Sequence, residues 1–183
     1  MRIKIPHIPY VARKISLDML NSGFIKFNSG TEAVTQIAHE ILMANALAER
    51  ALDEHTDRLL DDNEDDMEVM RVDRRNMFWM VKRRLAEESN FILTHEDRYN
   101  ALSYEILETA WKRNLIDYNV SENRAKNIIY QSIDGYLKNF EAIEDIVAEK
   151  IEKGSKKLIP GTDEYEIVFE KMYQDELRKR GVF

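Results

Sequence analysis

Residues 18–28 read DMLNSGFIKFN, and residues 108–119 read ETAWKRNLIDYN. In both stretches a helical pattern of apolar residues gives way to a short segment rich in β-branched and aromatic side chains. An offset of 91 residues places Ile25 on Ile116. The two stretches therefore predict the same local structure, which is the end of a helix followed by a short extended connector.

The same offset aligns apolar positions along much of the chain, and twice 91 is close to the full length of 183 residues. The aligned pairs are Ile15 with Ile106, Leu20 with Trp111, Phe24 with Leu115, Phe27 with Tyr118, Asn28 with Asn119, Ile37 with Ile128, Leu42 with Ile133, Ala51 with Ala142 and Phe78 with Phe169. The pattern predicts two similar helical lobes, residues 1–91 and 92–183, related by a diverged tandem repeat. Identities are few, and apolar periodicity alone produces some of these matches, so chance agreement is the alternative.

The predicted fold is mainly α. Apolar residues recur at helical spacing over six segments, at 8–21, 31–60, 73–88, 95–113, 121–152 and 162–180. The connectors FIKF and LIDY predict at most one short strand each, with the extended segments RIKIP, NFIL and KKLIP as candidate partners. Helix–connector–helix units with a short strand are also compatible with winged-helix-like modules.

Composition excludes several classes of protein. The chain has no cysteine, so disulfides, thiolate metal sites and cysteine nucleophiles are ruled out. The first residues lack the apolar run of a signal peptide, and no stretch approaches the roughly 20 apolar residues that a membrane span needs. We therefore expect a cytoplasmic protein that does not contact the membrane.

No residue pattern supports a cofactor, a metal ion or catalysis. His39 and His55 lie sixteen positions apart on one predicted helix, about 24 Å along its axis, so they cannot share an ion within one chain. The acidic run DDNEDD at 61–66 has aspartate where a calcium loop needs glycine, so a solvated turn is the simpler interpretation. Glycine-rich phosphate loops, serine elbows and HExxH motifs do not occur, although a novel enzyme stays a third alternative.

Charge is distributed unevenly behind the net value of −7. Residues 49–73 carry eleven acids against three arginines, which gives 3 − 11 = −8. The N-terminal segment is basic, and its candidate contact residues are Arg2, Lys4, Arg13 and Lys14. Local fields of opposite sign matter more for recognition than the total charge.

A second basic segment, RRNMFWMVKRR at 74–84, follows the acidic one. On a helix, Trp79 has three cations about one turn away, namely Arg75, Lys82 and Arg83, and can stack on a base, on a partner's ring or on its own cations. One interpretation packs this basic face against the acidic face of the last helix. The other makes Trp79 and its cations an external binding surface.

Several segments resemble a bacterial family known as domain of unknown function family 507. The resemblance is carried by IPHIPYVARKI at 5–15, LNSGF at 20–24, DRRNMFWMVKRRLAEE at 73–88, DYNVSENRAKN at 117–127 and LIPGTDEYEIVFEKMYQDELRKRG at 158–181. It covers nearly the whole chain and implies a cytoplasmic bacterial protein of mainly helical structure. It implies no established activity, so it transfers no catalytic residue.

The function we expect is that of a non-enzymatic protein-interaction scaffold. Its partner would be another protein or a second copy of the chain, bound through the basic N-terminal residues and the Trp79 face. The alternative is nucleic-acid binding, in which the N-terminal cations contact phosphates and Trp79 stacks on a base.

Overall fold

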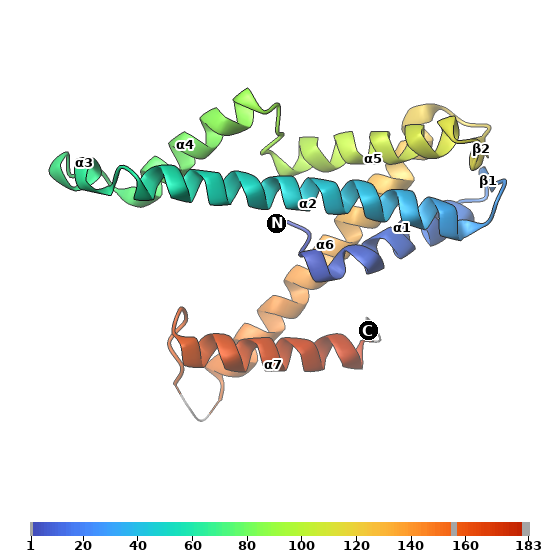
Figure 1. The fold of residues 1–183 in the computed structure, drawn as a ribbon. Coiled ribbons are helices and arrows are strands. Elements are labelled where there is room, and N and C mark those ends of the chain that lie inside the picture. The colour runs from blue at the N-terminus through green and yellow to red at the C-terminus, as the bar shows by residue number, and fades with distance from the viewer. Residues whose placement is uncertain (1, 155–156, 181–183) are drawn as a thin grey trace. The chain divides into compact units, whose positions relative to one another are not determined.

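The structure is a computed structural model that describes residues 2–154 and 157–180, and it is mainly α-helical (Figure 1). Along the described chain the elements are η1 (Ile5–His7), α1 (Ile8–Asn21), β1 (Ile25–Phe27), α2 (Thr31–Asp61), α3 (Glu64–Val69), α4 (Arg74–Glu88), α5 (His95–Lys112), β2 (Ile116–Tyr118), α6 (Glu122–Glu152) and α7 (Asp163–Lys179). The chain divides into two compact units, residues 2–131 and residues 132–183, with the boundary inside α6.

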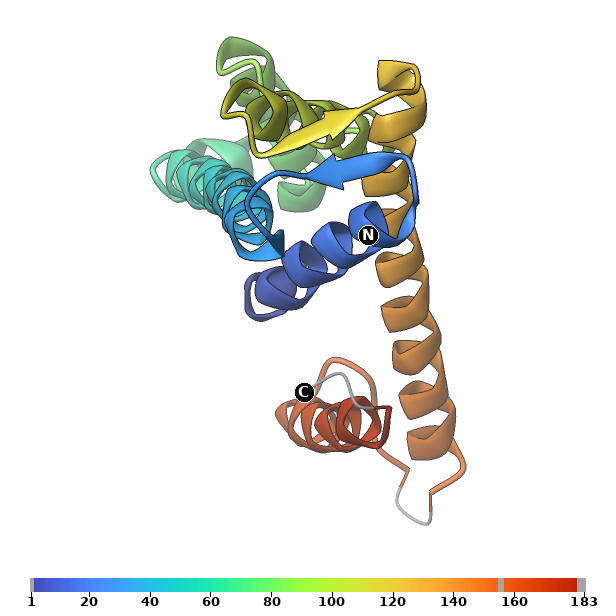
Figure 2. The same cartoon turned by 90° about the vertical axis from the view of Figure 1, so that its right-hand side faces the viewer.

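The two predicted connector strands pair with each other. β1 and β2 form a two-stranded antiparallel sheet in which Lys26 lies opposite Asp117 (Figure 2). The flanking pairs join Ile25 to Tyr118 and Phe27 to Ile116, so the register is symmetric about its central pair. Ile25 and Ile116 are both buried, which fixes which face of each strand packs against the helices.

The chain turns into each strand through a residue in the left-handed conformation. Gly23 has φ 78° after α1, and Asn114 has φ 57° after α5. Glycine adopts this conformation without steric cost, and asparagine is among the residues that tolerate it best. The two helices therefore end in the same way at equivalent distances from their strands.

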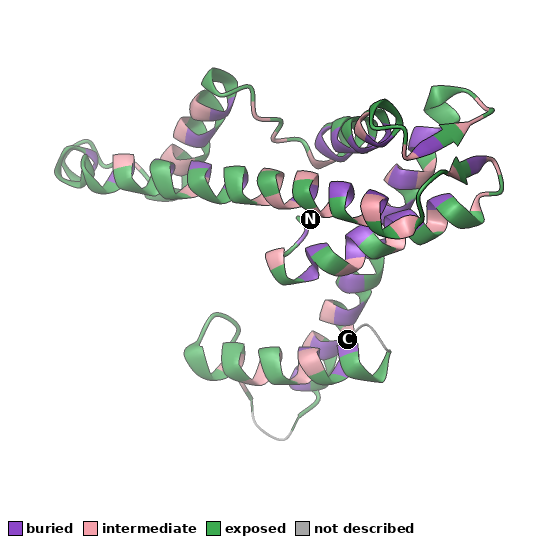
Figure 3. Cartoon of the chain, turned by 45° about the vertical axis from the view of Figure 1, so that its right-hand side comes forward, coloured by how far each residue is buried: buried purple, intermediate pink, exposed green. Residues whose placement is uncertain are grey.

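Within residues 2–131, α2 is the central helix against which α1, α4 and α5 pack. Its first half buries an apolar stripe that includes Val34, Ile37 and Leu42. Its second half buries Leu52 and Leu60 but also the polar side chains of Glu49 and Thr56. The second half of α2 is therefore held by ion pairs to α4 and α5 as well as by apolar packing. Figure 3 shows that only part of this half is buried.

Residues 132–183 contain the last two thirds of α6 and all of α7. Phe140 and Tyr173 join the two helices, with ring centroids 6.3 Å apart, and Phe169 stacks on Tyr173 at 6.0 Å. The pKa of the Tyr173 hydroxyl is raised, and burial is the largest cause. The nearby carboxylate of Glu144 raises this pKa further. The helices are also tied by an ion pair from Lys150 Nζ to Glu176 Oε1 at 2.5 Å.

The helical prediction is confirmed, but three details were not anticipated. The acidic run at 61–66 is not one turn, because α3 begins inside it at Glu64. The segment RIKIP includes the start of a 3₁₀ turn, and NFIL is not a strand, so neither pairs with the connectors. In KKLIP, Lys156 lies outside the described residues, and the rest of that segment is not a strand.

Candidate functional site

The first turn of α4 is anchored on α2. Asp73 caps the helix by accepting a hydrogen bond from the backbone N–H of Asn76 at 3.0 Å. Arg74 then reaches back to α2, where its Nη2 lies 2.6 Å from Asp61 Oδ1 and 3.5 Å from Asp57 Oδ1. The hydrogen bond to Asp61 raises the pKa of the Arg74 guanidinium above its ordinary value. These contacts fix where α4 starts along α2.

Trp79 lies on the exposed side of α4, with 55% of its surface accessible. The ring nevertheless has two internal contacts. Phe78 meets it edge-on at a centroid distance of 5.8 Å, and Lys82 Nζ lies 5.3 Å from its centroid. The indole is therefore ordered by its neighbours without filling a cavity in the core.

Lys82 is buried, with 5% of its surface accessible, whereas one of the two interpretations of the sequence made it part of an external binding surface. Its ammonium lies 2.5 Å from Asp53 Oδ1 on α2, and a buried charge needs such a partner. Lys82 therefore lies against the Trp79 ring and does not present its charge to solvent.

Asp53 also binds the N-terminal segment. Arg2 Nη1 lies 3.1 Å from Asp53 Oδ2. The Asp53 carboxylate therefore forms an ion pair with one residue from each predicted basic surface. No local pattern connects the two surfaces, because Asp53 is one acid among eleven in residues 49–73. The structure therefore brings Arg2 and Lys82 together on α2.

The other predicted contact residues are distributed along the same unit. Arg75 and Arg83 are exposed on α4, and Lys4 and Arg13 are exposed at the N-terminus. Lys14 forms an ion pair with Asp18 at 2.6 Å on its own helix. Arg75 and Arg83 are thus the exposed cations that flank Trp79 along α4, four positions before and after it.

A second ion pair beside the site was not predicted. Arg98 on α5 is 2% exposed, and its Nη1 lies 3.1 Å from Glu49 Oε2 on α2. Its guanidinium also lies over the rings of Phe91 and Tyr99, at 5.3 and 5.4 Å. The hydroxyl of Tyr99 accepts a hydrogen bond from the backbone N–H of Ile3 at 2.9 Å, which attaches the N-terminal segment to α5.

Over residues 2–154 and 157–180, no group of three or more histidine, aspartate or glutamate side chains is arranged to hold a metal ion. In that same part of the chain, no helix is both long enough and apolar enough to cross a membrane.

Comparison with known proteins places the chain in a family. A family model described as "Protein of unknown function (DUF507)" matches residues 1–182. The chain therefore belongs to the DUF507 family, as its sequence resemblance indicates. No match was found among curated proteins.

Proposed function

We propose that this DUF507 chain is a non-enzymatic protein-binding module and that the exposed face of α4 around Trp79 contacts its partner. The observation that carries the proposal is the state of Trp79, which is half exposed and yet held by Phe78 and Lys82. Tryptophan and arginine are enriched among the residues that contribute most to protein–protein affinity. An ordered ring also loses little conformational freedom on binding.

The surroundings of Trp79 suggest the chemistry of the partner. Arg75 and Arg83 are exposed on either side of the ring, and Met80 is exposed next to it. An apolar recess with acidic residues at its edge would complement this face. Arg2 extends the basic surface, because it shares the Asp53 carboxylate with Lys82.

The test uses a photo-crosslinking amino acid in place of Trp79. The chain has a matched control position, since Trp111 is the other tryptophan and is 52% exposed. We expect a crosslinked protein partner from position 79 but not from position 111. A second chain carries the photo-crosslinking amino acid in place of Met80 and should form the same product. Adding Trp79→Ala and Arg83→Glu to this chain should abolish the product.

Lys82 is unsuitable for this test because its loss would leave Asp53 without its buried cation. Equal crosslinking from positions 79 and 111 would reject the Trp79 face as the binding site. Unchanged crosslinking in the Trp79→Ala, Arg83→Glu chain would reject it as well. Circular dichroism of each variant checks that total helix content is unchanged before the products are compared.

Nucleic-acid binding is the second candidate, and the exposed Trp79 between two arginines favours it because such a ring can stack on a base. A salt titration with single-stranded and duplex oligonucleotides separates the two functions. Phosphate contacts make log affinity fall steeply with log salt concentration. No oligonucleotide binding at low salt would remove this candidate.

We also propose that residues 1–91 and 92–183 derive from a tandem duplication. Several element bounds support this origin, because α2 and α6 both span 31 residues and start 91 positions apart. β1 and β2 start 91 positions apart, and the ends of α1 and α5, and of α4 and α7, differ by the same number. An alignment of family members in which the two halves match each other would test the proposal independently.

A further inference from the structure

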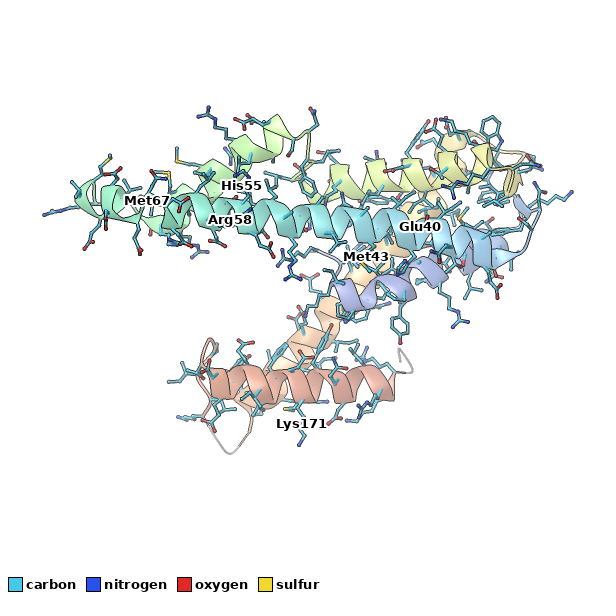
Figure 4. The ribbon with its side chains drawn as sticks, in the orientation of Figure 1. Glu40, Met43, His55, Arg58, Met67 and Lys171 are labelled. Atoms are coloured by element: carbon cyan, nitrogen blue, oxygen red, sulfur yellow. The ribbon has the colours of Figure 1, made fainter. Side chains whose placement is uncertain are left out.

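We propose a second binding site on the opposite side of α4, a methionine-lined groove that accepts a basic amphipathic helix of a partner protein. The groove lies between the end of α2, α3 and α4, within residues 2–131. Met67, which Figure 4 labels on α3, is one of the residues that line it. The proposal does not depend on the Trp79 face.

The groove is apolar and large enough to hold side chains of a partner. Its volume is about 500 Å³, within the range of about 300–1,000 Å³ that is usual for ligand pockets. The residues that line it include Leu59, Met67, Met70, Met77 and Leu85. Methionine side chains are flexible and polarisable, so they adapt to the varied apolar residues of a bound helix.

The exposure of Met70 shows that the groove is not closed by the chain around it. This side chain is 70% accessible, although it belongs to the lining. The neighbouring Val69 is 83% accessible but does not line the groove. Met70 therefore leaves the apolar lining open to solvent at this point.

The charge at the groove specifies the occupant. Residues 62–68 contain five carboxylates and no basic residue, and all five are exposed. One of them, Asp66, is part of the groove lining. Arg84 lies at the other edge, but it is paired with Glu88 at 3.1 Å. An apolar groove with an acidic edge is complementary to a helix that has one apolar face and lysines or arginines beside it.

The helix pair formed by α6 and α7 has charged residues at the positions that the 91-residue offset aligns with this lining. With the 91-residue offset, Leu59 corresponds to Lys150, Leu85 to Glu176 and Glu88 to Lys179. In α6 and α7 those charged residues form ion pairs, Lys150 with Glu176 at 2.5 Å and Lys179 with Glu176 at 3.2 Å. In α6 and α7 these positions therefore hold a charged bridge, whereas Leu59 and Leu85 make the aligned positions of α2 and α4 apolar.

The two sites lie on different sides of α4. Met77 and Val81 line the groove and are each two positions from Trp79, which places them about 160° around the helix from it. A partner in the groove therefore need not contact the indole. Failure of one site in an experiment does not imply failure of the other.

The test measures binding of a fluorescent synthetic peptide to the full chain by anisotropy. The probe is an amphipathic helix of about 18 residues with leucines on one face and lysines on the other. Two control peptides replace every lysine with glutamate or scramble the order of the residues. We expect saturable binding of the basic helix only, which weakens as salt concentration rises.

The decisive variants are Met70→Glu and Val69→Glu, which place the same charge at adjacent exposed positions. Met70→Glu should weaken binding at least tenfold, and Val69→Glu should change it less than twofold. Leu59→Lys with Leu85→Glu copies the ion pair of α6 and α7 and should also abolish binding. Trp79→Ala should leave peptide affinity unchanged.

Several outcomes would overturn the proposal. They are equal binding of the acidic or scrambled peptide, equal effects of the two glutamate variants, and absence of binding to all peptides. A change in oligomeric state on Met70→Glu, measured by light scattering without peptide, would instead assign the groove to self-association. Loss of peptide binding on Trp79→Ala would place the peptide on the other face of α4.

Discussion

Lys82 and Asp53 form the contact that joins α4 to the centre of its unit, with the ammonium 2.5 Å from the carboxylate and the lysine almost fully buried. The same carboxylate holds Arg2, and the same ammonium lies beneath Trp79. The pair therefore orders the exposed indole and attaches the N-terminal segment to α2.

Lys82→Met should destabilise residues 2–131 by about 2 kcal/mol, because it leaves Asp53 with only the exposed Arg2 as a partner. Asp53→Leu added to Lys82→Met should recover part of that loss, since replacing both partners of a buried pair with apolar residues is often nearly neutral. Urea unfolding followed by tryptophan fluorescence measures both, because Trp79 and Trp111 lie in this unit. A double variant less stable than Lys82→Met would contradict the argument.

Glu49→Ala should cost about 3 kcal/mol, since it leaves the buried guanidinium of Arg98 without its carboxylate. The control is Glu54→Ala on the same helix, which removes an exposed ion pair with Arg50 and should cost less than about 1 kcal/mol. Urea midpoints of the two variants give the comparison. Similar losses would mean that the Glu49–Arg98 pair has no special role in stability.

Glu176→Gln should remove part of the pH dependence of the α6–α7 contact. Hydrogen bonds from Lys150 and then Lys179 lower the pKa of Glu176 below its ordinary value. A carboxyl whose pKa is lower in the folded state contributes stability above its unfolded pKa and loses it as pH falls through the folded value.

Amide hydrogen exchange along α7 tests this prediction. The original chain should be better protected than Glu176→Gln at about pH 6, and the difference should shrink toward about pH 3. Glu170→Gln on the same helix is the control, because Glu170 is exposed. A constant difference across this pH range would show that Glu176 does not act through its charge.

Lys26→Asp should destabilise the β1–β2 sheet by about 0.5–1 kcal/mol, because it places two acids directly opposite each other. Lys26→Asp together with Asp117→Lys exchanges the charges and should restore stability. The symmetric register supports this expectation, since the pair lies at its centre. Thermal unfolding of the single and double variants measures both stabilities. A double variant as unstable as Lys26→Asp would argue against a paired interaction between positions 26 and 117.

The candidate site was only partly predictable. The helical spacing of RRNMFWMVKRR correctly predicted a helix with Trp79 beside cations. The helical spacing could not predict that Lys82 is buried and Arg83 exposed. Both residues lie near Trp79 on the helix, and only the packing against α2 distinguishes them. The acidic turn gave no sign of α3 or of the groove, since a groove requires three segments to meet.

The sequence by itself determined the six longer helices and the positions of the two short strands, because hydrophobic period and backbone conformational preference act between near neighbours. Tertiary structure alone decided that β1 pairs with β2, that Asp53 receives both Arg2 and Lys82, and that Arg98 is buried against Glu49. Each of these is a contact between residues distant in the chain. Its free energy depends on desolvation and on the geometry of the partner, which no local pattern records.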